Sequence, residues 1–279
     1  MEKKRITPVD VIKKIIIALV VIVDAYPIFW LFTCAFKKSS EFVTKPSFAL
    51  PEGLYLKNFS EAWTRGNMGL YFRNSLIYTA LALVFIVILS MTIGFAVTQM
   101  EWKMKNFFAD FFLLGLMVPV ATALLPLFQI YNNTGLTNTR LCLVLTYIAF
   151  GLSLSIFLVT GYMRSLPREI LEASVIDGCG IYSMMWHIVF PLMKNAAVTV
   201  LVLQFFYKWN DLLFSMTFIS DSKLKTIQTG LLYFENEFGT KDWGAIFASI
   251  AISVFPMLII YMILNKTVIE GMTSGAVKG

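Results

Sequence analysis

The stretch Glu172-Ala173-Ser174-Val175-Ile176-Asp177-Gly178, followed by Ile188-Val189-Phe190-Pro191, decides how the rest of the chain is interpreted. It belongs to a polar segment, residues 164–195, that separates two long apolar runs. Its carboxylates are costly to place in lipid. Its acidic, glycine and apolar residues recur at spacings too regular for a simple connector. We therefore expect this segment to lie at a membrane surface and to contact another protein.

The composition indicates that lipid surrounds most of the chain. Of its 279 residues 58% are hydrophobic and only 14% charged, against about 25% charged in soluble domains. Six apolar runs exceed the roughly 18–20 residues that cross a bilayer, and in lipid such runs form helices. We predict an all-α integral membrane protein with about six transmembrane helices, at Ile15–Phe36, Ser75–Met100, Phe107–Tyr131, Leu141–Met163, Ala196–Ile219 and Gly244–Leu264.

The basic residues before the first run set the expected orientation. Lys3, Lys4, Arg5, Lys13 and Lys14 cluster there, and such a cluster favours the cytoplasmic side. The run is too long for a signal peptide, so we expect it to remain as a span. The predicted division is a cytoplasmic N-terminus (1–14), a first transmembrane helix (15–36), an extracytoplasmic loop (37–74), a core of five spans (75–264) that includes the cytoplasmic segment 164–195, and a cytoplasmic tail (265–279). The net charge of +6 fits anionic lipid headgroups and does not require nucleic acid.

Segment 164–195 has the pattern of two short helices joined by a turn. Pro167 is suited to a helix start, and one helix face would then carry Glu169, Glu172, Ala173 and Ile176. Gly178 and Gly180 are expected to end this helix, because glycine readily adopts positive φ. A second helix would run over 181–188 towards Pro191. We predict a helix-turn-helix at the membrane surface, between spans four and five.

The spacing of this segment resembles that of the membrane subunits of binding-protein-dependent ABC importers. Their pattern is Glu-Ala-Ala, three residues, Gly, nine residues, Ile, one residue, Leu-Pro. Glu172-Ala173, Gly178, Ile188 and Pro191 match it, while Ser174 replaces the second Ala and Phe190 replaces Leu. Both replacements preserve size or apolar character.

Other stretches resemble the carbohydrate branch of that family, the permeases of the maltose-transporter type. They are Leu166-Pro167-Arg168-Glu169, Trp209-Asn210-Asp211, Asp242-Trp243-Gly244 and the C-terminal stretch 271–279. The resemblance extends from about Asn74 to the C-terminus. Ser215 departs from it, because many relatives carry Pro there.

The resemblance implies a permease subunit of an ATP-driven importer in a prokaryotic plasma (inner) membrane, multi-pass, with both termini cytoplasmic. Such a subunit forms half of a pathway for a carbohydrate, here an oligosaccharide. Its partners would be a second homologous permease subunit, a dimeric cytoplasmic ABC ATPase and an extracytoplasmic sugar-binding protein. The sequence contains no Gly-x-x-x-x-Gly-Lys-Ser/Thr loop. We therefore expect ATP and Mg to be used by the partner ATPase, and this chain to bind no cofactor or metal and to be no enzyme.

Segment 164–195 would be the contact with the ATPase. A helix with small Ala173 and Ser174 fits a groove, Glu172 offers a carboxylate to a basic partner, and Gly178 lets the two helices fold back. The full set of expected coupling residues is Glu169, Glu172, Ala173, Ser174, Asp177, Gly178, Ile188 and Pro191. The alternative is that the acidic residues merely solvate a surface loop.

The fifth run carries polar residues where charge is costly. Counted from Asn195 at about 1.5 Å per residue, Asp211 would lie near the outer leaflet. Trp209, Asn210 and Asp211 are therefore candidates for the sugar pathway, because sugars are held by aromatic faces and polar edges. Equally, Lys208 would reach towards the interface and Asp211 would pack against a neighbouring helix.

The sequence bears on three other function classes. A self-contained secondary transporter or channel would show repeated halves, broken helices and acids at the bilayer midplane, and no repeat is visible. An ABC permease for a non-sugar solute remains an alternative. A membrane enzyme lacks signatures such as His-Glu-x-x-His. Asp24, inside the first run, is interpreted as structural or interfacial, and Pro119, Pro126 and Pro256 are expected to kink their helices.

Overall fold

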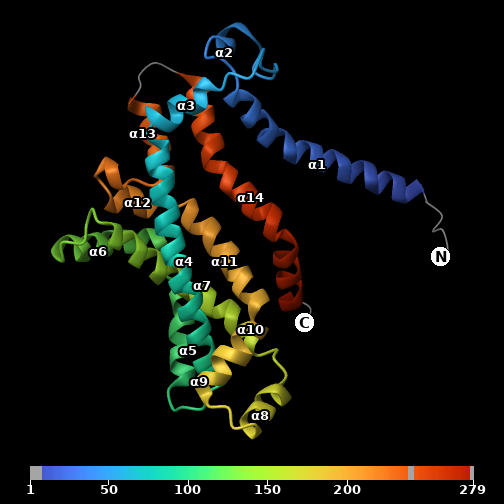
Figure 1. The fold of residues 1–279 in the computed structure, drawn as a ribbon, viewed down its shortest axis with the longest axis vertical. Coiled ribbons are helices and arrows are strands. Elements are labelled where there is room, and N and C mark those ends of the chain that lie inside the picture. Colours follow the sequence, from blue (N-terminus) through green and yellow to red (C-terminus); the bar gives the residue numbers. More distant parts are fainter. Residues whose placement is uncertain (1–7, 238–241, 277–279) are drawn as a thin grey trace. The chain divides into compact units, whose positions relative to one another are not determined.

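The computed structural model describes residues 8–237 and 242–276, and every regular element within them is a helix (Figure 1). The longer helices are α1 (Pro8–Ala35), α4 (Met68–Thr98), α5 (Lys105–Leu114), α6 (Val120–Asn133), α7 (Arg140–Met163), α8 (Arg168–Ile176), α11 (Lys194–Trp209), α13 (Ile227–Glu237) and α14 (Trp243–Ala276). The short ones are α2 (Glu41–Thr44), α3 (Lys57–Thr64), η1 (Gly115–Met117), α9 (Ile181–Met184), η2 (Met185–Val189), α10 (Phe190–Leu192), α12 (Leu213–Phe218) and η3 (Ser222–Leu224).

Four of the described helices are long and apolar enough to cross a membrane, and two bent helix pairs raise the number to six. The four are α1, α4, α7 and the part of α14 from Trp243 to Leu264. This confirms the predicted fold class, an all-α protein with about six candidate spans.

The third expected span is broken in the middle. Residues Lys105–Met117 and Val120–Asn133 form two helices that meet at 102°. The break falls at Pro119, because the residue before a proline is driven out of the helical region, and Val118 is extended with ψ 113°. By contrast, α6 and α14 continue through Pro126 and Pro256.

The expectation of one continuous helix from Ala196 to Ile219 is wrong. Helix α11 ends at Trp209, and a separate short helix, α12, begins at Leu213. The preceding part, Ile181–Leu192, is bent from α11 by 71°. The apolar composition of the run gave no sign that α11 would end before Leu213.

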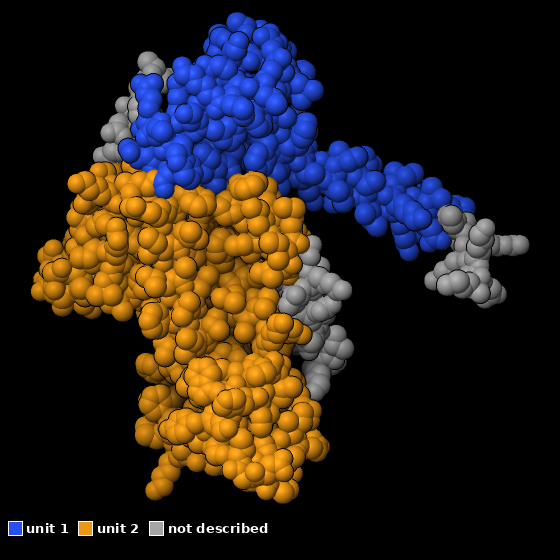
Figure 2. All heavy atoms as spheres, viewed as in Figure 1, with its two compact units in different colours: residues 1–69, 231–254 blue, residues 70–230, 255–279 orange. Residues whose placement is uncertain are grey.

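The chain divides into two compact units, coloured separately in Figure 2. Unit 1 comprises residues 1–69 and 231–254, and unit 2 comprises residues 70–230 and 255–279.

In unit 1, one amide side chain closes the end of α1. The Asn58 side-chain nitrogen donates to the carbonyl oxygens of Ala35 and Lys37, each at 2.8 Å, and these groups lack a partner within the helix. Gly244 lies against Asn58, so near that a Cβ atom would come within 2.6 Å of the amide nitrogen. Asp242 accepts from the Ser39 hydroxyl and from the Ala245 N–H at the start of α14. The Asp242-Trp243-Gly244 stretch thus joins α14 to the chain after α1.

The loop after α1 is held by buried charged groups. Glu41 is 4% exposed and accepts from the backbone N–H groups of Lys38 and Glu52, both at 3.0 Å. Burial alone raises the pKa of Glu41, but these two N–H groups and the charges of Lys45 and Lys37 outweigh it and hold the pKa below its ordinary value. The carboxylate therefore stabilises the loop in its charged form.

Unit 2 is built around α4, α7 and α11. On α4, Tyr78, Ala82 and Ile86 follow one another at four-residue intervals, and all three are fully buried. Between α7 and α11, the Gln204 side-chain nitrogen donates to the Gly151 carbonyl and to the Ser155 hydroxyl, both at 3.1 Å. Polar bonds of this kind hold helices together where lipid provides no hydrophobic driving force.

Candidate functional site

Helix α8 ends in a tight, glycine-dependent turn. It begins after Pro167, as expected, and Gly178 has φ +76°. The Cys179 N–H donates to the Ser174 carbonyl at 2.9 Å and the Gly178 N–H to the Val175 carbonyl at 3.0 Å, which is a Schellman motif. Gly180 plays a different part from the one expected. With φ −67° it is extended and precedes the first residue of α9.

The outer surface of α8 combines acidic and apolar side chains. Glu169, Glu172 and Asp177 are exposed, and their carboxylates make no ion pair or hydrogen bond with the described residues. Ile176 is 85% exposed and Val175 is 62% exposed. Exposed apolar groups rimmed by charge are typical of a protein-binding surface.

The other expected coupling residues differ in how accessible they are. Ala173 and Pro191 are exposed, and Ile188 is half-buried. Ser174 is 4% exposed, and its hydroxyl donates to the Leu171 carbonyl at 2.6 Å. Ser174 therefore supports α8 from inside and does not belong to its exposed surface.

The second helix of the segment contains a π-turn that the sequence analysis missed. After α9, residues Met185–Val189 form η2, in which the Phe190 N–H bonds to the Met185 carbonyl. Pro191 lacks the N–H that would continue the α-helical pattern, which favours the wider turn. His187 lies on this turn, with Nδ1 at 3.2 Å from the Ser183 carbonyl oxygen.

Asp211 lies between the end of α11 and the start of α12 and binds the first turn of α12. Its two carboxylate oxygens accept from the backbone N–H groups of Phe214, at 3.2 Å, and Ser215, at 3.0 Å. The Tyr147 hydroxyl on α7 donates to the same carboxylate at 2.9 Å. Lys208 is 8% exposed, with its ammonium 5.7 Å from the centre of the Tyr147 ring. Asp211 therefore caps the first turn of α12 from the position before the N-cap residue, Leu212, and is tied to α7.

Of the three candidate pathway residues, only Asn210 has an exposed side chain. Trp209 is 1% exposed and stacks on Phe205, with ring centres 5.4 Å apart. The Asn210 amide nitrogen donates to the Phe206 carbonyl at 2.9 Å, and its oxygen accepts from Gln228 at 3.2 Å. The structure therefore leaves Asn210 and Gln228 as the accessible polar pair at this helix break.

Ser215, the position at which the sequence resemblance favours Pro, belongs to a cluster of hydroxyl groups next to the break. The buried Ser215 hydroxyl accepts from Thr226, at 2.9 Å, and from Thr229, at 2.7 Å. Proline would provide neither this acceptor nor the N–H that Asp211 binds. The sequence analysis missed Thr226 and Thr229, because they lie more than ten residues from Ser215.

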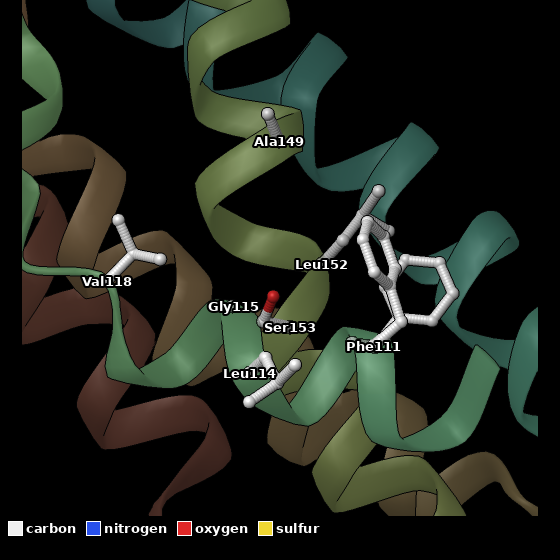
Figure 3. Close-up of a pocket in the computed structure, with 8 residues that line it drawn as sticks. Phe111, Leu114, Gly115, Val118, Ala149, Leu152 and Ser153 are labelled. Carbon is white, nitrogen blue, oxygen red and sulfur yellow. The ribbon is translucent and has the colours of Figure 1, made fainter. Parts of the chain in front are cut away.

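An apolar pocket of about 430 Å³ lies where α5 and η1 meet α7 (Figure 3). Its lining is apolar apart from the Ser153 hydroxyl, which lies beside Gly115. The lining residues are Phe111, Phe112, Leu114, Gly115, Val118, Ala149, Leu152 and Ser153. One hydroxyl does not suit a sugar, which presents several polar groups, so this pocket is not a candidate for the sugar site.

Comparison with known families places nearly the whole chain in one of them. Residues 8–273 match the sequence profile of the family described as "Binding-protein-dependent transport system inner membrane component". The chain is 36% identical over 261 residues to the Bacillus subtilis (strain 168) "Probable ABC transporter permease protein YurM", covering 94% of this chain and 86% of that protein.

Two further relatives have names that include a solute. The Streptomyces coelicolor "Diacetylchitobiose uptake system permease protein NgcG" is 31% identical, over 89% of this chain and 82% of its own length. The Bacillus subtilis "Melibiose/raffinose/stachyose import permease protein MelC" is 29% identical, over 94% of each chain. A solved structure of a bacterial ABC transporter that imports alginate has the same fold, with a TM-score of 0.82 at 17% identity over 95% of this chain and 98% of that one.

Proposed function

Because the chain belongs to the family of inner membrane components of binding-protein-dependent transport systems, we propose that α8 is the surface through which a separate ATPase drives it. The chain is a multi-pass permease of the inner membrane. What supports α8 as the contact is its exposed surface: three carboxylates without a partner among the described residues, next to Val175 and Ile176. A basic groove on an ATPase would complement both features.

Within this proposal the coupling residues fall into two groups. Glu169, Glu172, Ala173 and Asp177 would touch the ATPase, because their side chains are exposed. The remaining four would hold α8 in place: Ser174 through its bond to Leu171, Gly178 through its positive φ, and Ile188 and Pro191 through the helix that leads into α11. ATP and Mg would be bound by the ATPase and no cofactor by this chain.

The proposed cargo is a carbohydrate, and specifically an oligosaccharide. The relatives named for diacetylchitobiose and for melibiose, raffinose and stachyose support this class. Asn210 and Gln228 are the proposed contacts at the helix break, since amides bind sugar hydroxyls. Trp209 and Asp211 would stabilise the break without contacting the sugar, because Trp209 packs on Phe205 and Asp211 caps α12.

The importer is proposed to contain a second homologous permease subunit, a dimeric cytoplasmic ATPase and an extracytoplasmic sugar-binding protein. Both termini of this chain would lie in the cytoplasm, as the Lys and Arg residues before α1 indicate. Segment 164–195 would then face the ATPase. The broken helices are also typical of secondary transporters, but the family match favours the importer.

A charge reversal tests this function in the complete importer reconstituted in liposomes. Glu172→Lys is expected to abolish uptake of the sugar that the copurifying binding protein carries. The control is Glu101→Lys, which reverses an exposed acid between α4 and α5. The Glu101 carboxylate pairs with the Lys105 ammonium at 2.8 Å. This variant should keep uptake near the wild-type rate. Full uptake with Glu172→Lys would show that α8 is not the ATPase contact.

A further inference from the structure

The loop after α1 carries apolar side chains that remain largely exposed among the described residues. Val43 is 85% exposed, Phe48 74% and Leu50 63%. We call residues 43–50 the anchor turn. Exposed apolar side chains do not stabilise a loop in water. Apolar patches of this kind mark a contact with another molecule or with lipid.

The depth of the anchor turn is set by its bond to α1. The Trp30 indole N–H donates to the Ser47 carbonyl at 2.9 Å, and the Lys37 ammonium donates to the same oxygen at 3.1 Å. Trp30 lies more than one helical turn before Ala35, the last residue of α1. The turn therefore lies against the last turns of α1, and Figure 1 shows α2 next to the end of α1.

A second contact gives the same depth. The Phe42 ring stacks on Phe247, with centres 5.4 Å apart, and the Trp30 ring meets Phe247 edge-on at 5.3 Å. Phe247 lies about one turn inside α14, which begins at Trp243. Trp30 of α1 and Phe247 of α14 thus both contact this part of the loop at a level inside the ends of their own helices.

The length of α1 relates this depth to the membrane. From Ile15, just after Lys14, to Ala35 the helix rises about 30 Å at ~1.5 Å per residue, which matches the ~30 Å of a hydrocarbon core. Ala35 then lies at the boundary of the core, and Trp30 about 7 Å inside it. Lys37 follows Ala35 by two residues, and lysine is typical of this interfacial level.

We propose that the anchor turn inserts into the lipid leaflet beside α1, with Val43, Phe48 and Leu50 among the upper acyl chains. The outer half of α1 also carries exposed aromatic side chains, with Phe29 55% exposed and Tyr26 50%. This lipid contact goes beyond transport itself. It fixes the junction of α1 and α14 at one level of the membrane while other parts of the chain move.

Leu54 provides a matched control within the same loop. It is 74% exposed, the same fraction as Phe48. The next residue, Tyr55, donates its N–H to the Phe36 carbonyl at 3.1 Å, beyond the end of α1. Leu54 should therefore lie at headgroup level or in water. Because Phe48 and Leu54 are equally exposed, a difference between them reports depth in the membrane and not exposure.

Spin labels at these positions test the proposal in the complete importer, reconstituted in phosphatidylcholine–phosphatidylglycerol vesicles. Phe48→Cys, Val43→Cys and Leu54→Cys would be labelled in a Cys179→Ser background, since the native Cys34 and Cys142 are fully buried. Collisions with dissolved oxygen and with a water-soluble nickel chelate report depth. We expect labels at 43 and 48 to favour oxygen several-fold over nickel, and the label at 54 to show the reverse.

Two results would overturn the proposal. One is nickel accessibility at positions 43 and 48 equal to that at 54, which would place the turn in water. The other is loss of access to both reagents at position 48 when the binding protein is added, which would identify a protein-docking surface in place of a lipid contact.

Discussion

Replacing Asp211 distinguishes a structural cap from a residue of the sugar pathway. In Asp211→Ala the backbone N–H groups of Phe214 and Ser215 and the Tyr147 hydroxyl all lose their acceptor. Loss of an N-terminal cap costs about 1 kcal/mol, and a buried hydroxyl left without a partner costs about 1–3 kcal/mol. We therefore expect the free energy of unfolding to fall by about 2–4 kcal/mol. Asp211→Asn keeps one acceptor oxygen and should lose about half as much.

The double-mutant cycle with Tyr147→Phe isolates the bond between α7 and the cap. Alone, Tyr147→Phe should cost about 1 kcal/mol, and in the Asp211→Ala background almost nothing, because the bond is already absent. The assay is unfolding of the purified permease in mixed micelles titrated with sodium dodecyl sulfate and followed by circular dichroism. Additive costs, or an Asp211→Ala variant as stable as wild type but inactive in uptake, would refute the cap and restore Asp211 to the pathway.

Three further changes have defined outcomes. Gln204→Leu should lower the free energy of unfolding by about 0.5–1.5 kcal/mol in the same titration, because polar bonds between membrane helices are worth that much; no loss would contradict the role given to its bonds. Glu41 has a pKa held below its ordinary value of 4.5, so its stabilising effect is present above that pH and is lost as the pH falls through the lowered pKa. The melting temperature should therefore drop more steeply in wild type than in Glu41→Gln below about pH 4.5, and parallel curves would rule out this contribution. At Gly178, with φ +76°, Val should reduce coupled uptake strongly while Asn, which tolerates positive φ, should preserve most of it; equal uptake by the two variants would show that the turn is not required.

The sequence was most informative where one physical signal dominated. Lipid requires long apolar runs to be helical, and this gave the fold class and the extents of α1, α7 and much of α14. Pro167 and Gly178 gave the limits of α8, because both act through their own backbone.

Features that depend on contacts between residues far apart in the sequence could not be predicted from it. The cap on α12 depends on Asp211 together with Tyr147, a residue on another helix, so the apolar run was taken as one span. Trp209 was assigned to a pathway by residue type, but the structure buries it against Phe205. Ser174 was assigned to the docking surface, and only the packing around α8 places it inside.

The central claim, that α8 is the ATPase contact, is tested most directly by cross-linking in the assembled importer. Ile176 is 85% exposed on α8, whereas Met104, 51% exposed in the turn before α5, provides the control on the side assigned to the cytoplasm. With a photoreactive amino acid at each position, we predict a strong cross-link from position 176 to the ATPase subunit and a weak one or none from position 104. A cross-link from 176 only to lipid or to the second permease subunit, with the ATPase present and hydrolysing ATP, would contradict the account.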